Sequence, residues 1–192
     1  RRGDGPTRLR GASAATTASE TDVATQIMNR IGIIGAGAWG TALSLLARRA
    51  GAECVIWALE PEVVASINAN HENALFLPGV ALDPLVHATG ELAEAARCDA
   101  VLLVVPAQHM RAVTSRLAPV LGDHVPVVIC AKGIEQETLA LMTEIVGETL
   151  VGRPLAVLSG PTFAAEVAAD HPTAVTLAMG GAVPAKALVE AL

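Results

Sequence analysis

Short apolar runs alternate along the chain with longer stretches in which apolar and polar residues recur at helical spacing. Two of the short runs, VLLVV and VPVVIC, are apolar at every position. Strands that are covered on both faces of a parallel sheet have this pattern. The runs predict strands at Arg30–Gly35, Glu53–Ala58, Ala100–Val105, Val125–Ala131, Pro154–Ser159 and Thr173–Ala178, and a weaker strand at Leu85–Ala88.

The stretches between these runs have the spacing of helices. We predict helices at Trp39–Ala50, Pro61–Asn70, Glu91–Ala96, Gln108–Val120, Thr138–Leu150, Phe163–Ala169 and Pro184–Leu192. Alternating β and α elements favour an open, doubly wound sheet that is joined by right-handed crossovers. The pattern therefore predicts one α/β domain with a mainly parallel sheet.

The two ends of the chain differ from this pattern. Residues 1–28 are rich in Arg, Ser, Thr and Gly and lack the apolar core of a secretory signal peptide. We interpret them as a disordered leader, or as a start that was set too far upstream of Met28. The predicted domain then comprises residues 29–192. Because the chain ends inside the helical run AKALVEAL, we expect it to be truncated there.

Composition narrows the classes of partner. The chain has 192 residues, of which 52% are hydrophobic, so it can bury one substantial core. A formal charge of −6 argues against a nucleic-acid or anionic-membrane partner. The uncharged stretch Ile31–Ala47 is shorter than the roughly 20 residues that a bilayer requires. We interpret it as strand, tight turn and helix rather than as a membrane span.

Cysteine and histidine spacing gives no metal site. The three cysteines, Cys54, Cys98 and Cys130, are far apart and form no CxxC pair, which predicts free thiols in a reducing, cytoplasmic setting. No HxxxH, HxH or GxSxG pattern is present, so metal hydrolysis and serine catalysis lack support. We expect loop and surface positions for the five histidines, which are His71, His87, His109, His124 and His171.

The segment Gly35-Ala36-Gly37-Ala38-Trp39-Gly40 lies between the first predicted strand and the first predicted helix. In a GxGxxG turn the first glycine permits the tight turn, the second lets the backbone approach a pyrophosphate, and the third lets helix and strand pack closely. The amides at the start of the helix then face the anion. A strand before the turn and a helix after it form the context of a Rossmann fold that binds NAD(H) or NADP(H).

The end of the second predicted strand bears on the choice of cofactor. Asp or Glu at this point binds the ribose 2′-hydroxyl of NAD, whereas a nearby Arg accommodates the 2′-phosphate of NADP. The chain reads Trp57-Ala58-Leu59-Glu60. Glu60 comes slightly late, and a solvated carboxylate at a helix start is an equal interpretation. Since no Arg occurs at this edge, the sequence leans weakly to NAD.

Three further turns follow predicted strands: Val105–Gln108, Ala131–Glu135 and Ser159–Thr162. Ligands of doubly wound sheets bind at this edge, so we expect the turns to rim one crevice. Lys132 either reaches a phosphate or carbonyl oxygen there or is a solvated loop lysine. Gly160-Pro161-Thr162 is expected to open a helix, with Thr162 binding substrate or capping that helix.

Several motifs match one family together. IGIIGAGAWGTALS, NALFLPGV, VVPAQHMR, AKGIE and LSGPTFAAEVA, in this order, resemble the amino-terminal domain of NAD(P)-dependent glycerol-3-phosphate dehydrogenase from about Asn29 onward. The resemblance implies reversible hydride transfer between dihydroxyacetone phosphate and sn-glycerol 3-phosphate for glycerophospholipid synthesis. It also allows a homodimer of the intact protein.

The resemblance assigns residues by position. It implies cofactor contacts from Gly35, Gly37, Ala38, Trp39, Gly40, Leu59, Pro106, Lys132 and Ala164. It implies substrate contacts from Lys132, Gly160 and Thr162, with Lys132 as the candidate catalytic residue. Leu59 departs from the family, in which His or Arg is frequent at this position, and this departure puts NADP affinity in doubt.

The family continues into a helical carboxy-terminal domain. A Gly-Gly-Ala-x-Lys-Asn segment there supplies the proton-accepting lysine, and a later Arg-Asn segment binds the substrate phosphate. Gly180–Pro184 begins like the first segment but lacks its Lys-Asn pair. The resemblance therefore implies that this chain alone is inactive. The alternatives are a stand-alone nucleotide-binding regulatory module, or a dehydrogenase of another small phosphate ester or hydroxy acid.

Overall fold

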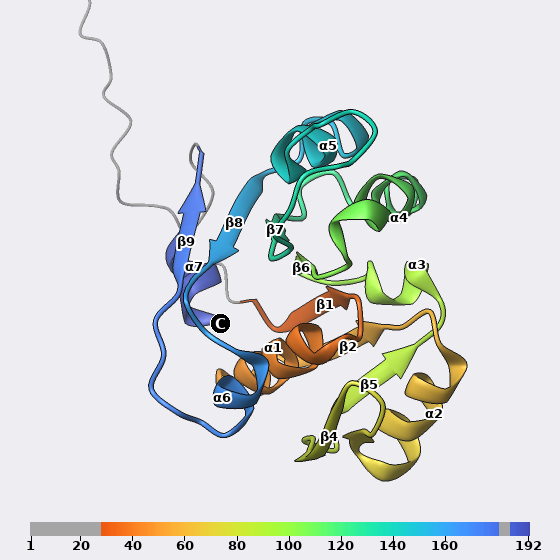
Figure 1. The fold of residues 1–192 in the computed structure, drawn as a ribbon, viewed down its shortest axis with the longest axis vertical. Helices are drawn as coiled ribbons and strands as arrows, with labels where there is room; N and C mark the ends of the chain where they lie inside the picture. The colour runs from red at the N-terminus through yellow and green to blue at the C-terminus, as the bar shows by residue number, and fades with distance from the viewer. Residues whose placement is uncertain (1–27, 181–184) are drawn as a thin grey trace, which may run out of the picture.

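The computed structural model describes residues 28–180 and 185–192 (Figure 1). Most of the predicted leader, at residues 1–27, and most of the Gly180–Pro184 segment, at residues 181–184, lie outside the described residues. Met28, the last residue of the predicted leader, is only 6% exposed and packs against the core. The packed part of the chain therefore includes one residue of that segment.

The sheet has seven strands in the order β5-β2-β1-β6-β7-β8-β9. Their bounds are β1 (Arg30–Ile34), β2 (Glu53–Trp57), β5 (Val86–Thr89), β6 (Ala100–Leu103), β7 (Val127–Ile129), β8 (Leu155–Ser159) and β9 (Thr176–Met179). The first six are parallel, and β9 runs antiparallel to β8. This is the Rossmann strand order with one added edge strand, and its direction of winding changes between β1 and β6. The predicted fold class is confirmed.

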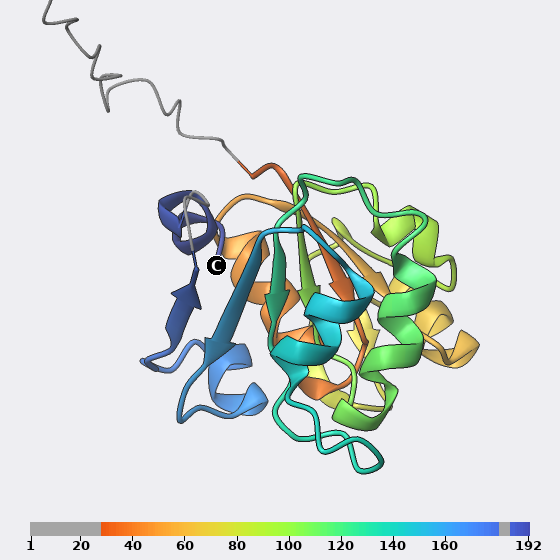
Figure 2. The ribbon, with the colours of Figure 1, turned by 90° about the horizontal axis from the view of Figure 1, so that it is seen from above.

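Helices cover both faces of the sheet (Figure 2). One layer contains α1 (Ala38–Arg49), α2 (Pro61–Asn70) and α7 (Ala185–Glu190). The other contains α3 (Leu92–Ala95), α4 (Met110–Leu117) and α5 (Met142–Thr149). The short helix α6 (Ala164–Ala168) packs alongside α1, through the cluster that Val167 forms with Ala42.

Each face of the sheet carries its own apolar cluster. Ile33 and Leu102 belong to the cluster beneath α1, whereas their chain neighbours Ile34 and Leu103 belong to the cluster beneath α4. Successive side chains of a strand point to opposite faces, so a strand that is buried on both sides must be apolar throughout. This is the physical reason for the uninterrupted runs in the sequence.

A small hairpin between α2 and β5 was not predicted. It consists of β3 (Glu72–Asn73) and β4 (Leu77–Ala81), which pair antiparallel. Two residues are too few to produce a visible alternation of apolar and polar positions, and Pro78 and Gly79 indicate a turn rather than a strand. The hairpin becomes important at the functional site.

The predicted helix at Thr138–Leu150 begins later than expected, at Met142. Before it, the chain folds back so that Ile134 pairs antiparallel with Leu141. The carboxylate of Glu144 then accepts a hydrogen bond from the Leu141 amide at 2.7 Å, which satisfies a donor that has no partner inside the helix. Residues 138–141 are therefore a loop.

Other boundaries also moved. The predicted helix Gln108–Val120 is divided into a 3-10 turn, η1 (Ala107–His109), and α4, which ends two residues before Pro119. Proline has no amide hydrogen to continue a helix. The strand predicted at Val125–Ala131 is reduced to the three residues of β7, and that predicted at Thr173–Ala178 is shifted to β9.

Two expectations concern the surface. None of the described helices is both long and apolar enough to span a membrane, and Ile31–Ala47 forms β1, the glycine turn and most of α1. His87 lies in β5 and His109 in η1, so the expectation of loop positions was wrong for these two, although both are exposed. His71 is half-buried and ends α2 with a φ of 52°.

Candidate active site

The glycine turn connects β1 to α1 at the carboxyl edge of the sheet. Gly35 has a φ of 119°, a conformation that side chains disfavour, and its amide donates to the Trp57 carbonyl at 3.0 Å. A Cβ atom on Gly40 would overlap the carbonyl oxygen of Gly35. The first turn of α1 therefore lies directly against the backbone of the turn, at a separation that only glycine allows.

Gly37 faces open space instead. A Cβ atom on Gly37 would meet nothing within 4 Å. The first bond of the helix runs from the Thr41 amide to the Gly37 carbonyl at 3.0 Å, so the amides of Ala38, Trp39 and Gly40 have no acceptor within the helix. These donors lie at the positive end of the helix dipole. The turn thus combines free space with the donors that an anion requires.

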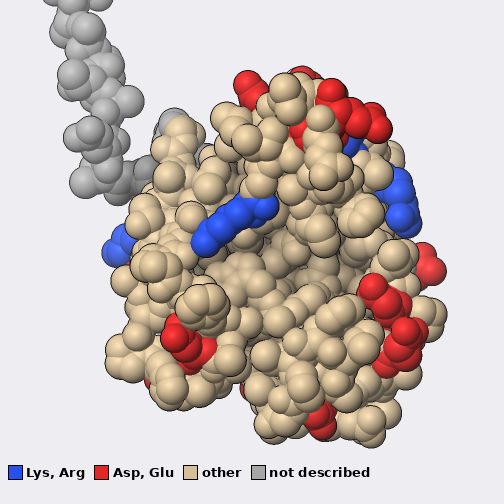
Figure 3. Space-filling model, viewed as in Figure 1, with Lys and Arg blue, Asp and Glu red and all other residues tan. Residues whose placement is uncertain are grey.

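A cleft of about 370 Å³ lies beside this turn, where the parallel strands end. Four segments line it: Trp39 of α1, Val104–Ala107 after β6, Cys130–Lys132 after β7, and residues between Leu158 and Ala164, from the end of β8 to the start of α6. Its size is within the range of small-molecule sites. Figure 3 shows the hollow with one basic side chain across it.

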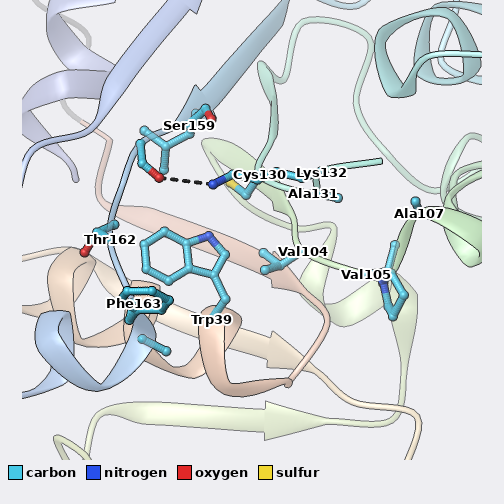
Figure 4. A pocket seen from close by; sticks show the side chains of 14 residues that line it. Trp39, Val104, Val105, Ala107, Cys130, Ala131, Lys132, Ser159, Thr162 and Phe163 are labelled. Carbon is cyan, nitrogen blue, oxygen red and sulfur yellow. Dashed lines mark hydrogen bonds between the residues drawn. The ribbon is translucent and has the colours of Figure 1, made fainter. Parts of the chain in front are cut away.

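Lys132 extends across the cleft from the loop after β7 to the loop after β8 (Figure 4). Its Nζ donates to the Gly160 carbonyl at 3.0 Å. Lys132 is the only basic residue among the described residues that line the cleft. Two residues that the resemblance assigns to the substrate are therefore in direct contact, and the ammonium keeps further N–H donors for an anion.

Thr162 contributes a hydroxyl with no partner. Its Oγ1 is buried and makes no hydrogen bond to any described residue. The structure also corrects the expectation that Gly160-Pro161-Thr162 opens a helix. The helix α6 begins at Ala164, with Phe163 at its N-cap and the Glu166 carboxylate accepting from the Phe163 amide at 3.2 Å. Thr162 does not cap this helix, and buried hydroxyls are normally paired.

Apolar side chains complete the wall of the cleft. The Trp39 indole is half-buried and occupies the middle of the view in Figure 4, with Phe163 next to it. Burial raises the pKa of the Cys130 thiol to about 12, so it stays protonated and serves as apolar lining. The cleft therefore offers flat apolar surface on one side and a single positive charge on the other.

Comparison with known proteins identifies the family. Residues 30–183 match the family described as NAD-dependent glycerol-3-phosphate dehydrogenase N-terminus. The chain belongs to this family. It is 57% identical over 165 residues to the glycerol-3-phosphate dehydrogenase [NAD(P)+] of Paramagnetospirillum magneticum, over 86% of this chain and 60% of that protein. Identity to the enzyme of the same name from Parvibaculum lavamentivorans is 55% over 163 residues, with 85% and 49% covered.

The solved structures agree with this assignment. The crystal structure of glycerol-3-phosphate dehydrogenase from Coxiella burnetii matches with a TM-score of 0.80 and 34% identity, over 85% of this chain and 50% of that one. The resemblance seen in the motifs is thereby confirmed. The chain spans about half to three fifths of the length of these glycerol-3-phosphate dehydrogenases.

The structure brings most of the assigned residues together. Those that line the cleft are Trp39, Pro106, Lys132, Gly160, Thr162 and Ala164. Gly35, Gly37, Ala38 and Gly40 form the adjoining turn. Leu59 is not part of the cleft and is 71% exposed beyond the end of β2.

Two charged residues, Glu60 and Arg116, lie close to Trp57 or follow it in the chain. Glu60 is the N-cap residue of α2, as one of the two interpretations expected, and its carbonyl accepts from the Val63 amide. No Arg is close to the end of β2 in the sequence, but α4 brings the Arg116 guanidinium to 5.7 Å from the centre of the Trp57 ring. Tertiary packing therefore adds a cation next to the last residue of β2.

Sequence reasoning missed the contacts that hold the loop carrying Lys132. The Gln108 side chain donates to the Ile134 carbonyl at 2.9 Å and accepts from the Gln136 amide at 3.0 Å. Arg111 forms a bidentate ion pair with Glu135, which holds the pKa of that carboxyl below its usual value. The sequence did contain the residues that make these contacts. Gln108 and Arg111 belong to the motif VVPAQHMR, and their partners Ile134 and Glu135 belong to the motif AKGIE.

Proposed function

We propose that this chain is the dinucleotide-binding half of a glycerol-3-phosphate dehydrogenase, which transfers hydride reversibly between dihydroxyacetone phosphate and sn-glycerol 3-phosphate. The observation that carries the proposal is that the glycine turn adjoins the cleft in which Lys132 meets Gly160. A site for a dinucleotide and a cation for a small anionic substrate thus share one crevice. The names of the relatives support this substrate pair.

The residues present fit a dinucleotide. The space in front of Gly37 and the amides of Ala38 and Trp39 suit a diphosphate. Trp39, Pro106 and Ala164 provide apolar wall beside it. When bound, NAD(H) or NADP(H) supplies or accepts the hydride.

We infer a preference for NAD. Leu59 offers no charge to a 2′-phosphate, and the carboxylate of Glu60 at the start of α2 is of the type that accepts from a ribose hydroxyl and repels a phosphate. A competition titration of NADH against NADPH tests this preference.

Lys132 acts on the substrate through its charge. An ammonium next to a ketone oxygen stabilises the negative charge that develops there as hydride is added, and the Thr162 hydroxyl adds a further donor. The reaction also requires a proton donor. No such group is assigned in this chain, and we propose that it comes from the part of the enzyme that this chain does not span. The chain alone then binds ligands without turnover.

We propose that the intact enzyme works in a reducing, cytoplasmic setting on a small-molecule substrate. Three free thiols, whose pKa values burial raises to about 12, are compatible with a reducing cytoplasm. The net charge of −6 supports a small-molecule substrate rather than a nucleic acid. Exposed apolar side chains such as Leu139 and Phe163 offer surface for the remainder of the enzyme or for a second subunit of a homodimer.

Tryptophan fluorescence tests the proposed cofactor site. The chain contains two tryptophans, and Trp39 lines the cleft whereas Trp57 is 4% exposed. Titration with NADH is expected to quench Trp39 emission in a saturable manner with energy transfer to the cofactor. The Trp39→Phe variant keeps an aromatic ring and should lose most of this signal. The absence of saturable binding of both NADH and NADPH would refute the proposal.

The Lys132→Ala variant tests the substrate site. The kcat/KM for dihydroxyacetone phosphate should fall about ten- to hundredfold, with kcat lowered as well, because the ammonium interacts most strongly with the charge that develops in the transition state. The Tm should not change, because the side chain is exposed. The assay uses the chain extended by the carboxy-terminal half that its relatives possess.

Lys186→Ala is the matched control for this variant. Lys186 is the second of the two lysines and is exposed on α7. Its removal should affect neither kcat/KM nor Tm. If Lys132→Ala left kcat/KM unchanged, or lowered Tm in parallel with activity, the assigned role would be wrong.

A further inference from the structure

Two polar side chains are fully buried behind the glycine turn, on the side away from the open space at Gly37. They are Thr41, in the first turn of α1, and Asn73, in the short strand β3. Both have 0% exposure, and neither lines the cleft. A buried polar pair that touches no ligand surface requires an explanation from its own contacts.

The hydrogen bonds of this Asn73–Thr41 pair are complete. The two amide hydrogens of Asn73 have two acceptors, the Ala36 carbonyl at 2.7 Å and the Thr41 hydroxyl at 2.8 Å. The side-chain oxygen of Asn73, Oδ1, accepts a hydrogen bond from the Phe76 amide at 3.1 Å. The Thr41 hydroxyl donates to the Gly37 carbonyl at 3.0 Å. Only a side chain with two donors and one acceptor can satisfy all the groups that meet Asn73.

These bonds hold two consecutive carbonyl groups of the turn. The Ala36 oxygen accepts from the buried Asn73 side chain, and the Gly37 oxygen accepts from the Thr41 hydroxyl as well as from the Thr41 backbone amide, which is the first bond of α1. The peptide bonds that carry them are therefore fixed with their oxygens toward the interior. Because glycine imposes little restriction on its backbone, the Ala36–Gly37 peptide would otherwise rotate readily, and an outward carbonyl oxygen would repel an anion.

We propose that Asn73 and Thr41 are positioning residues that pre-organise the glycine turn for the diphosphate of the dinucleotide. The inference rests on the proposed function of the turn. With both carbonyl groups held inward, only amide hydrogens and empty space face the ligand before it arrives. The backbone of the turn then loses less conformational entropy when the ligand binds. The unpredicted β3–β4 hairpin thereby acquires a role, since it carries Asn73 to the turn.

Two residues elsewhere in the fold make similar side-chain hydrogen bonds and serve as controls. Their replacement shows the effect of losing such bonds on stability alone. Thr114 on α4 is also fully buried, and its hydroxyl donates to the carbonyl four residues earlier, Met110, at 2.7 Å. The Asn68 side chain also bridges backbone groups, donating to and accepting from Ala88 at 2.8 Å in both bonds. Neither control residue contacts the glycine turn.

The first experiment compares Thr41→Val, Thr41→Ser and Thr114→Val in the 192-residue chain. Both valine variants should lower Tm to a similar extent. Only Thr41→Val should weaken NADH binding, by about tenfold, the effect of losing roughly one hydrogen bond. Thr41→Ser keeps the hydroxyl and should restore most of the affinity.

The second experiment uses the chain without cofactor. Asn73→Asp replaces two donors by a carboxylate that faces the Ala36 carbonyl, and Asn68→Asp is its control. Protection from hydrogen exchange at the amide of residue 41, which donates to the Gly37 carbonyl at 3.0 Å, should be lower in Asn73→Asp and Thr41→Val than in wild type. It should be unchanged in Asn68→Asp and Thr114→Val.

The outcomes separate the two proposals. If wild type binds NADH and Thr41→Val binds it as well as Thr114→Val does, the positioning role is overturned and the proposed function stands. If wild type binds neither NADH nor NADPH, the proposed function is overturned, and the inference with it. Equal protection of the residue-41 amide in all variants would also overturn the positioning role.

Discussion

Gly37→Val is expected to lower the affinity of the chain for NADH about hundredfold or more, with the Tm within about 2 °C of wild type. The backbone at Gly37 has φ −64° and ψ 177°, which valine tolerates, and no atom lies within 4 Å of the position of its Cβ. The isopropyl group would fill the space that the diphosphate must enter. It would disturb nothing in the folded protein.

Gly147→Val is the control for this prediction. Gly147 lies on the exposed side of α5, and its Cβ position is likewise open. NADH affinity, measured by calorimetry or fluorescence, should be unchanged in this variant. Undiminished affinity of Gly37→Val would show that the turn has only a structural role.

Gly40→Ala is expected to destabilise the protein by about 3 kcal/mol, which corresponds to a decrease in Tm of roughly 6–12 °C. The added methyl group would collide with the Gly35 carbonyl oxygen, a backbone atom that cannot turn aside as a side chain can. The helix α1 would have to move away from the turn, so the amides that face the cofactor would move as well. Cofactor affinity should therefore decrease together with stability.

The same substitution at Gly147 is expected to have the opposite effect on stability. Its position is an exposed helix interior with no neighbour near the added atom, so alanine should stabilise the fold by about 0.4–1 kcal/mol. Thermal unfolding followed by circular dichroism measures both variants. A Gly40→Ala variant as stable as wild type would show that helix and turn are not packed as closely as described.

The two glycine predictions follow from different physical properties of one short segment. Gly37 is required because the diphosphate must enter the space in front of it. Gly40 is required because the Gly35 carbonyl oxygen already packs against it. The GxGxxG pattern already assigned the second glycine to the approach of the pyrophosphate and the third to close packing of helix and strand. The structure shows open space at Gly37 and backbone contact at Gly40, in agreement with that division.

The fold was largely predictable from the sequence because its signal is local. Buried parallel strands must be apolar on both faces, and β1, β2, β6 and β8 were located to within two residues at either end. The start of one helix was misplaced because a contact formed by residues outside it decided where it begins. The delayed start of α5 depends on the pairing of Ile134 with Leu141.

The candidate site was predictable to the extent that its residues end strands. Trp39, Lys132 and Gly160 follow strands in the sequence. The carboxyl ends of parallel strands all lie at the same edge of the sheet, so these residues come together there. Glu166 shows the limit of this reasoning. By its bond to the Phe163 amide it defines the start of α6, and so it leaves Thr162 without a capping role.

The sequence by itself determined the approximate positions of the strands and helices, the glycine turn and the family. Periodicity and motif spacing are properties of residues that are close together in the chain. Only the tertiary structure decided that Lys132 meets Gly160 and that Asn73 holds the Ala36 carbonyl. Asn73 lies 37 residues from Ala36, and a hydrogen bond over that separation leaves no periodic trace in a sequence. Its partners become known only when the hairpin is folded against α1.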